Sequence, residues 1–105
     1  MSRSQTIIDP EWLHNAHAGE MLASEFMAPL DLEAAELAVA IDVPAARLAA
    51  LIAGDRPIDA ELDLRLARYF RMSDGFFLRL QLQHDLLEAK RALNGDLDRI
   101  IPHAA

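Results

Sequence analysis

Four side chains that could bind a metal lie near the N-terminus at intervals of three residues. On one continuous helix, Glu11, His14, His17 and Glu20 would share a face, and imidazoles with carboxylates are ligands that zinc accepts. Gly19 and the irregular segment before it argue against such a helix, and His14 and His17 are expected to be exposed. We therefore expect no metal site and no cofactor.

The chain offers no arrangement for nucleophilic catalysis. It has no cysteine, no Ser-His-Asp arrangement and no glycine-rich loop that could hold a phosphate group. Carboxylates are numerous, yet none accompanies a candidate nucleophile. The serines fall in the terminal arm, within a predicted helix or at a helix cap: Ser2, Ser4, Ser24 and Ser73. We therefore expect that the protein is not an enzyme.

Two arginines in the middle of the chain could contact a nucleic acid. Arg47 lies within an alanine-rich segment, and Arg56 follows the end of that segment. A guanidinium binds guanine through two hydrogen bonds, or it neutralises a phosphate. Either contact requires that the surrounding segments form helices and that one of these helices fits the major groove.

The sequence predicts two short helices with a tight turn between them around these arginines. Apolar stripes place the helices at about 32–41 and 44–53. Val43 is biased away from helical backbone by the proline that follows, whereas Pro44 suits the first turn of a new helix. Gly54 is placed to end the second helix. Two small residues would let the helices cross closely, as a helix-turn-helix motif requires: Ala35 and Ala38.

Further helices are predicted on both sides of this pair. A first helix spans about 19–28 and ends at Pro29, a fourth runs from its cap Asp59 to Phe70, and a fifth ends near Leu93. Further candidates are the cap of the fifth helix, Ser73 or Asp74, and two apolar anchors of the arm, Trp12 and Leu13. We predict an all-α, five-helix, lambda-repressor-like fold, with an arm at 1–16, a domain at 17–95 and a tail at 96–105.

Charge is distributed unevenly along the 105 residues, whose net charge is −7. Residues 31–63 carry eight carboxylates against two arginines, whereas residues 64–105 carry seven cations against five carboxylates. Because affinity for DNA comes largely from neutralised phosphates, an acidic helix-turn-helix weakens binding. No apolar run reaches the length of a membrane span and no secretion signal is evident, so we expect a cytoplasmic protein without membrane contact.

The fifth predicted helix has more apolar length than one small domain needs. A two-fold dimer interface would cover the surplus, because isologous pairing is the commonest oligomer and lets a DNA reader match two half-sites. The candidate dimerisation residues are Phe76, Phe77, Leu80 and Leu87.

Several of these segments together resemble the HigA-type antitoxins of the Cro/cI-like (XRE) helix-turn-helix family. The resemblance covers about residues 17–88. It rests on HAGEMLASEFMAPL at 17–30, on Leu37-Ala38, Val43-Pro44, Arg47, Gly54, Arg56 and Ile58, and most of all on DLRLARYFRMSDGFFLRLQLQHDL at 63–86. The resemblance implies a homodimer that represses its own toxin–antitoxin operon and neutralises an mRNA-cleaving toxin of the RelE-like type.

The surface that should read DNA departs from the family pattern. The candidate DNA-binding residues are Pro44, Ala45, Ala46, Arg47, Ala49, Ala50 and Arg56. Alanine offers only a methyl contact to thymine, so direct readout would rest on the two arginines. The family usually has a lysine or arginine before the position of Arg56, where this chain has Asp55. It usually has a glycine in the turn, where this chain has Asp42.

Two functions remain open at this point. The first is an operator-binding repressor of the antitoxin type, with double-stranded DNA and a RelE-like toxin as partners. The second is a protein-interaction module that keeps the helix-turn-helix fold while its DNA binding is weak or lost.

Overall fold

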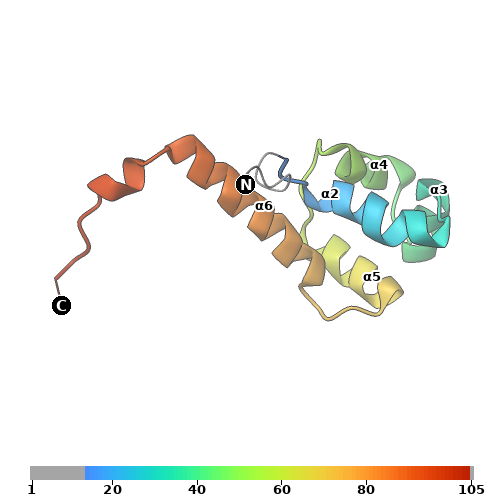
Figure 1. The fold of residues 1–105 in the computed structure, drawn as a ribbon. Coiled ribbons are helices and arrows are strands. Elements are labelled where there is room, and N and C mark those ends of the chain that lie inside the picture. The colour runs from blue at the N-terminus through green and yellow to red at the C-terminus, as the bar shows by residue number, and fades with distance from the viewer. Residues whose placement is uncertain (1–13, 105) are drawn as a thin grey trace, which may run out of the picture.

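Five α-helices form the body of the protein over residues 14–104, the part of the chain that this computed structural model describes (Figure 1). They are α2 (Ala18–Met21), α3 (Ala34–Ile41), α4 (Ala45–Ala53), α5 (Ala60–Phe70) and α6 (Phe76–Leu93). No strand occurs within these residues. The predicted all-α class is therefore confirmed. Glu11 and the two predicted anchors, Trp12 and Leu13, lie outside the described residues.

The first helical segment changes its hydrogen-bond register along its length. After α2 it continues as a π-helix, η1 (Leu22–Met27), and as a 3₁₀ turn, η2 (Ala28–Leu30). The segment ends at Asp31, which takes a left-handed φ of 52°. Pro29 lies within the 3₁₀ turn, so the segment runs one residue beyond the predicted stop.

His17 begins this segment as the N-cap of α2. Its Nδ1 accepts a hydrogen bond of 3.1 Å from the Glu20 N–H, which satisfies one of the amides that have no partner within the helix. The side chain is half-buried, so the prediction of an exposed His17 is wrong. His14 is exposed, as predicted, and its Nε2 lies 2.6 Å from a Glu20 carboxylate oxygen.

Helices α3 and α4 cross in the helix-turn-helix manner. The turn between them depends on Asp42, which adopts a left-handed φ of 59°, and on Pro44, which caps α4 with extended backbone. Aspartate tolerates the left-handed region better than most residues, so it can replace the glycine that is usual there. Gly54 ends α4 at φ 85°, as predicted.

Helix α4 approaches α2 closely at Gly19. A Cβ at this position would lie 1.8 Å from the Leu51 carbonyl oxygen, so only glycine fits between α2 and α4. Of the two alanines that were predicted to permit close crossing, Ala38 is buried but Ala35 is exposed. The prediction for Ala35 is wrong because that residue faces away from the core.

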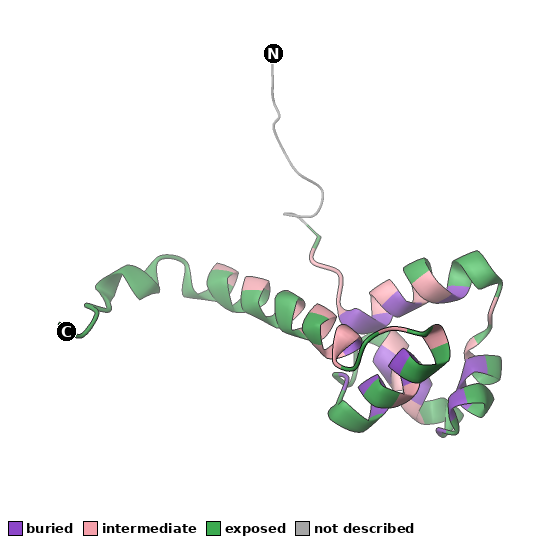
Figure 2. Ribbon diagram, turned by 90° about the horizontal axis from the view of Figure 1, so that it is seen from below, coloured by how far each residue is buried: buried purple, intermediate pink, exposed green. Residues whose placement is uncertain are grey.

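The hydrophobic core lies where α2, η1, α3, α4 and α5 converge on the first turn of α6. Its six largest fully buried apolar side chains come from each of these elements except α2: Leu22, Leu37, Leu48, Leu51, Leu66 and Phe77. Burial of this kind contributes about 25 cal/mol per Å² of apolar surface. Beyond the first turns, α6 leaves the body and points into solvent (Figures 1 and 2).

Asp63 fixes the start of α6. This buried carboxylate accepts hydrogen bonds from the N–H groups of Gly75 at 2.6 Å, Phe77 at 2.8 Å and Leu78 at 3.0 Å. The prediction that Ser73 or Asp74 caps α6 is wrong. The N-cap residue is Gly75, whose backbone is left-handed, and the acceptor comes from α5. The positive end of the α6 dipole compensates the buried negative charge.

Replacing this carboxylate tests the assignment. We expect Asp63→Ala to lower the free energy of unfolding by about 3 kcal/mol or more, because three amides lose their acceptor and at least one of them is buried. Asp74→Ala is the matched control and should cost less than about 0.5 kcal/mol, since this side chain is exposed. Urea denaturation of both variants measures the difference. Equal losses would contradict the assignment.

Candidate nucleic-acid interface

The side chains on the outward face of α4 are small and apolar. Pro44, Ala45, Ala46 and Ala49 are exposed and Ala50 is half-buried, while Leu48 and Leu51 point into the core. No side chain caps the start of α4. Backbone amides at the N-terminus of the helix are therefore available to an anion such as a DNA phosphate.

Arg47 is engaged within the protein. Its Nη2 donates to both carboxylate oxygens of Asp59, at 3.0 and 2.8 Å, and its Nη1 lies 3.6 Å from a Glu61 oxygen. The side chain is only 22% exposed. Sequence reasoning placed Arg47 among the DNA-reading residues without foreseeing that two carboxylates at the start of α5 would bind it.

Asp59 serves two helices at once. Besides pairing with Arg47 of α4, it accepts a hydrogen bond of 2.8 Å from the Leu62 N–H and so caps α5, as the sequence predicted. That backbone N–H is the largest cause of a pKa below the ordinary value of aspartate, and the charge of Arg47 adds to it. The carboxylate is therefore ionised, and available to a cation, throughout the neutral range.

Arg56 is free of such a pairing in the region that the structure describes. It is exposed in the loop between α4 and α5, next to the exposed Asp55, while Ile58 anchors the loop in the core. Of the two arginines singled out in the sequence, only Arg56 presents an unpaired guanidinium. Arg47 and the exposed alanines of α4 share the first turns of one helix, and Arg56 lies beyond its C-terminus.

The residues predicted for dimerisation lie mainly against the protomer itself. Phe77 is fully buried in the core, and the half-buried Phe76, Leu80 and Leu87 line the side of α6 that faces the body. Large exposed apolar side chains are found instead farther along α6 and in the segment that follows it: Leu82, Leu86, Leu93, Leu97, Ile100 and Ile101. Leu82, Leu86 and Leu93 follow a helical spacing, and Leu82 and Leu86 were not among the residues singled out from the sequence. The predicted tail contains a 3₁₀ turn, η3 (Asp96–Arg99).

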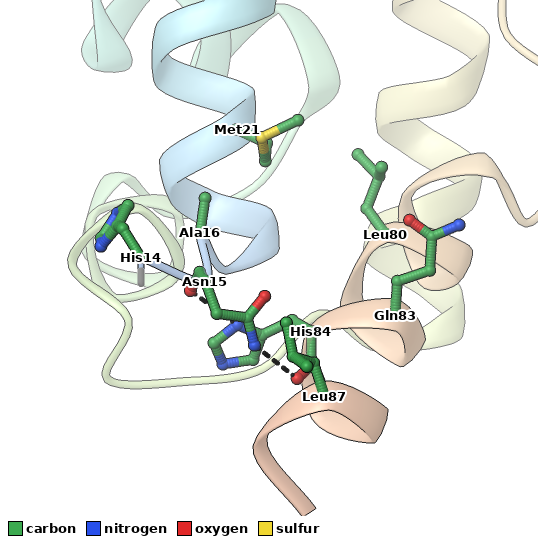
Figure 3. A pocket seen from close by; sticks show the side chains of 8 residues that line it. All are labelled: His14, Asn15, Ala16, Met21, Leu80, Gln83, His84 and Leu87. Atoms are coloured by element: carbon green, nitrogen blue, oxygen red, sulfur yellow. Dashed lines mark hydrogen bonds between the residues drawn. The ribbon is translucent and has the colours of Figure 1, made fainter. Parts of the chain in front are cut away.

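A small cavity separates the N-terminal segment from α6 (Figure 3). Asn15 bridges it by donating to the His84 carbonyl at 2.8 Å and to Glu88 at 3.1 Å, while the His84 Nδ1 lies 3.0 Å from the Asn15 carbonyl. His84 is a half-buried residue of α6. No set of three metal-ligating side chains gathers anywhere in residues 14–104.

Comparison with known proteins assigns this geometry to a class. The chain is 33% identical to PA4674 of Pseudomonas aeruginosa, solved in complex with its operator DNA, with a TM-score of 0.81 over 88% of this chain and 98% of that one. It is 38% identical to the uncharacterised HTH-type transcriptional regulator YbaQ of Escherichia coli, over 69% of this chain and 64% of YbaQ. The fold and α4 therefore define a helix-turn-helix protein of the transcription-regulator class.

The more specific relationship comes from the antitoxins. The Pseudomonas aeruginosa antitoxin HigA, solved with the higBA promoter, is 33% identical, with a TM-score of 0.77 over 87% of this chain and 100% of that chain. The chain belongs to the HigA-type antitoxins of the XRE helix-turn-helix family. No family model matches the sequence. In residues 14–104, no helix has the length and hydropathy needed to cross a membrane.

Proposed function

We propose that this protein is a repressor of the antitoxin type, which binds operator DNA of its own operon and neutralises an mRNA-cleaving, RelE-like toxin. The observation that carries the proposal is the exposed first turn of α4, presented by a helix-turn-helix whose relatives were solved on operator or promoter DNA. An interaction module without DNA binding is the alternative, and the comparisons do not favour it.

DNA binding by this surface rests on few groups. The candidate contacts are the amides at the start of α4, the exposed Pro44, Ala45, Ala46 and Ala49, the half-buried Ala50, and the guanidinium of Arg56. Because alanine cannot hydrogen-bond to base edges, discrimination between sequences is small. We infer weak binding with a shallow dependence on salt, since each neutralised phosphate adds about −0.9 to the slope of log K against log salt.

The DNA proposal is tested on a duplex of the chain's own promoter region. Arg56→Ala should weaken binding about tenfold or more, because no neighbouring cation shares its contact. Ala45→Arg combined with Asp55→Lys should strengthen binding, since it restores a base-reading group and replaces a repulsive carboxylate. Fluorescence anisotropy measures both. Ser24→Ala, a change in an exposed residue of η1, is the control and should leave affinity unchanged. If the restored variant binds no duplex, the interaction-module function replaces this one.

The toxin half of the proposal has its own test. The product of the gene adjacent to this chain's gene should arrest growth when expressed alone, and co-expression of the full chain should restore growth. An adjacent product that has no effect on growth or on mRNA integrity would contradict this half and leave the DNA half intact.

We further propose a homodimer built by the distal part of α6. Helix α6 projects from the body (Figure 2), and its exposed Leu82, Leu86 and Leu93 share one face by their spacing. Further apolar residues are exposed beyond α6. A second copy meeting this face about a two-fold axis would cover it, because isologous contact pairs each apolar side chain with an apolar partner. Two reading helices would then be available to two half-sites.

Two leucines of similar exposure test the dimer. Leu86 on α6 is 52% exposed and Leu64 on α5 is 50% exposed. Leu86→Glu should convert the protein to a monomer at tens of micromolar, because two carboxylates would face each other in an apolar interface. Leu64→Glu should leave the assembly unchanged. Sedimentation velocity measures both, and a wild-type chain that sediments as a monomer would overturn the proposal.

A further inference from the structure

Both carboxylate oxygens of Asp59 accept hydrogen bonds from one nitrogen of the Arg47 guanidinium, Nη2. The contact of 2.8 Å has the usual length of a charge-assisted hydrogen bond and that of 3.0 Å is slightly longer, while Glu61 supplies a second ion pair at 3.6 Å. A guanidinium forms charge-assisted hydrogen bonds with a carboxylate or with a phosphate. Asp59 therefore binds the guanidinium group that a DNA phosphate would otherwise bind.

The position of Arg47 makes this pairing consequential. It lies in the first turn of α4, and Asp59 lies at the start of α5, so two positive helix ends flank the guanidinium. A cation at a helix N-terminus is repelled unless an anion accompanies it. Within the described part of the chain, Asp59 and Glu61 are the anions paired with Arg47, and on DNA a phosphate could take their place.

We propose that Asp59 is an affinity-setting residue of the DNA surface, an intramolecular competitor that withholds Arg47 from the phosphate backbone. The inference rests on the proposed DNA-binding function and deepens it. A duplex must displace a carboxylate that is already held by the Leu62 N–H before Arg47 can contribute. The number of phosphates that each protomer neutralises is then one fewer than the arginines near α4 suggest.

The geometry also allows a purely structural role, in which the ion pair only ties α4 to α5. The two roles differ in what happens when the charge is removed and the cap is kept. A structural tie predicts no gain in DNA affinity, whereas a competitor predicts a gain that requires Arg47.

The variant Asp59→Ser distinguishes the competitor role from the structural role, because serine is as good an N-cap as aspartate but carries no charge. Asp55→Ser is the matched control: it removes one exposed carboxylate from the same loop, and no hydrogen bond or ion pair joins that side chain to Arg47 in the described structure. The third variant is Arg47→Ala, alone and combined with Asp59→Ser. All are measured on a duplex of the chain's own promoter region by fluorescence anisotropy over a range of salt concentrations.

We expect Asp59→Ser to bind about five- to tenfold more tightly than wild type and Asp55→Ser only about twofold, since the control changes only the general field. The salt slope of Asp59→Ser should steepen by about 0.9 per protomer, one phosphate more, and that of Asp55→Ser should not change. In the Arg47→Ala background the extra gain and the extra slope should vanish.

Equal affinities for the two serine variants, an unchanged salt slope, or a gain that persists without Arg47 would overturn the competitor role while wild-type binding stands. If wild type and every variant fail to bind any duplex, the proposed DNA function fails, which is a different result. Circular dichroism spectra of each variant are compared with that of the wild type to check that the variant is folded. Should Asp59→Ser unfold, Asp59→Asn keeps both the cap and the side-chain size and gives the same comparison.

Discussion

The hydrogen bonds that Asp63 accepts at the start of α6 are the constraint on which the rest of the structure depends. One buried carboxylate on α5 accepts hydrogen bonds from three backbone N–H groups at the start of α6, and these bonds fix the angle between α5 and α6. That angle places Phe77 in the core and directs the distal part of α6 away from the body. The core and the proposed dimer surface thus depend on the same contact.

A similar arrangement is found at the start of α4, the surface proposed to bind DNA. Asp59 caps α5 and pairs with Arg47 of α4, so a carboxylate at a helix N-terminus again joins two neighbouring helices. In the first case the acceptor satisfies backbone amides that would otherwise be buried without a partner. In the second it binds a side chain that could have met DNA. The acidic residues of 31–63 therefore form specific pairs within the protein in addition to contributing net charge.

Membership of the HigA-type antitoxins favours DNA binding, whereas the exposed residues of α4 favour weak base recognition. Relatives were solved with operator or promoter DNA, yet the first turns of this α4 expose mostly alanine. The contacts proposed here, backbone amides and Arg56, would bind phosphates but would supply little base discrimination. A dimer would compensate in part, because two weak reading units on one duplex bind together more tightly than either alone.

The sequence by itself determined the helices and their order, because these follow from local rules. Apolar spacing set α3, α4 and α5, proline after Val43 set the turn, and Gly54 and Asp59 marked an end and a beginning. The family motifs added the class of protein. Each of these signals acts within a few residues, so no tertiary contact was needed to read it.

Only the tertiary structure decided which side chains meet across helices. It replaced the local cap of α6, Ser73 or Asp74, by Asp63, which lies 12 residues before Gly75 in the chain. It likewise paired Arg47 with Asp59, assigned Phe77 to the core and moved the exposed apolar face to Leu82 and Leu86. These outcomes depend on the angles at which helices pack, and a one-dimensional pattern of residue types does not contain those angles.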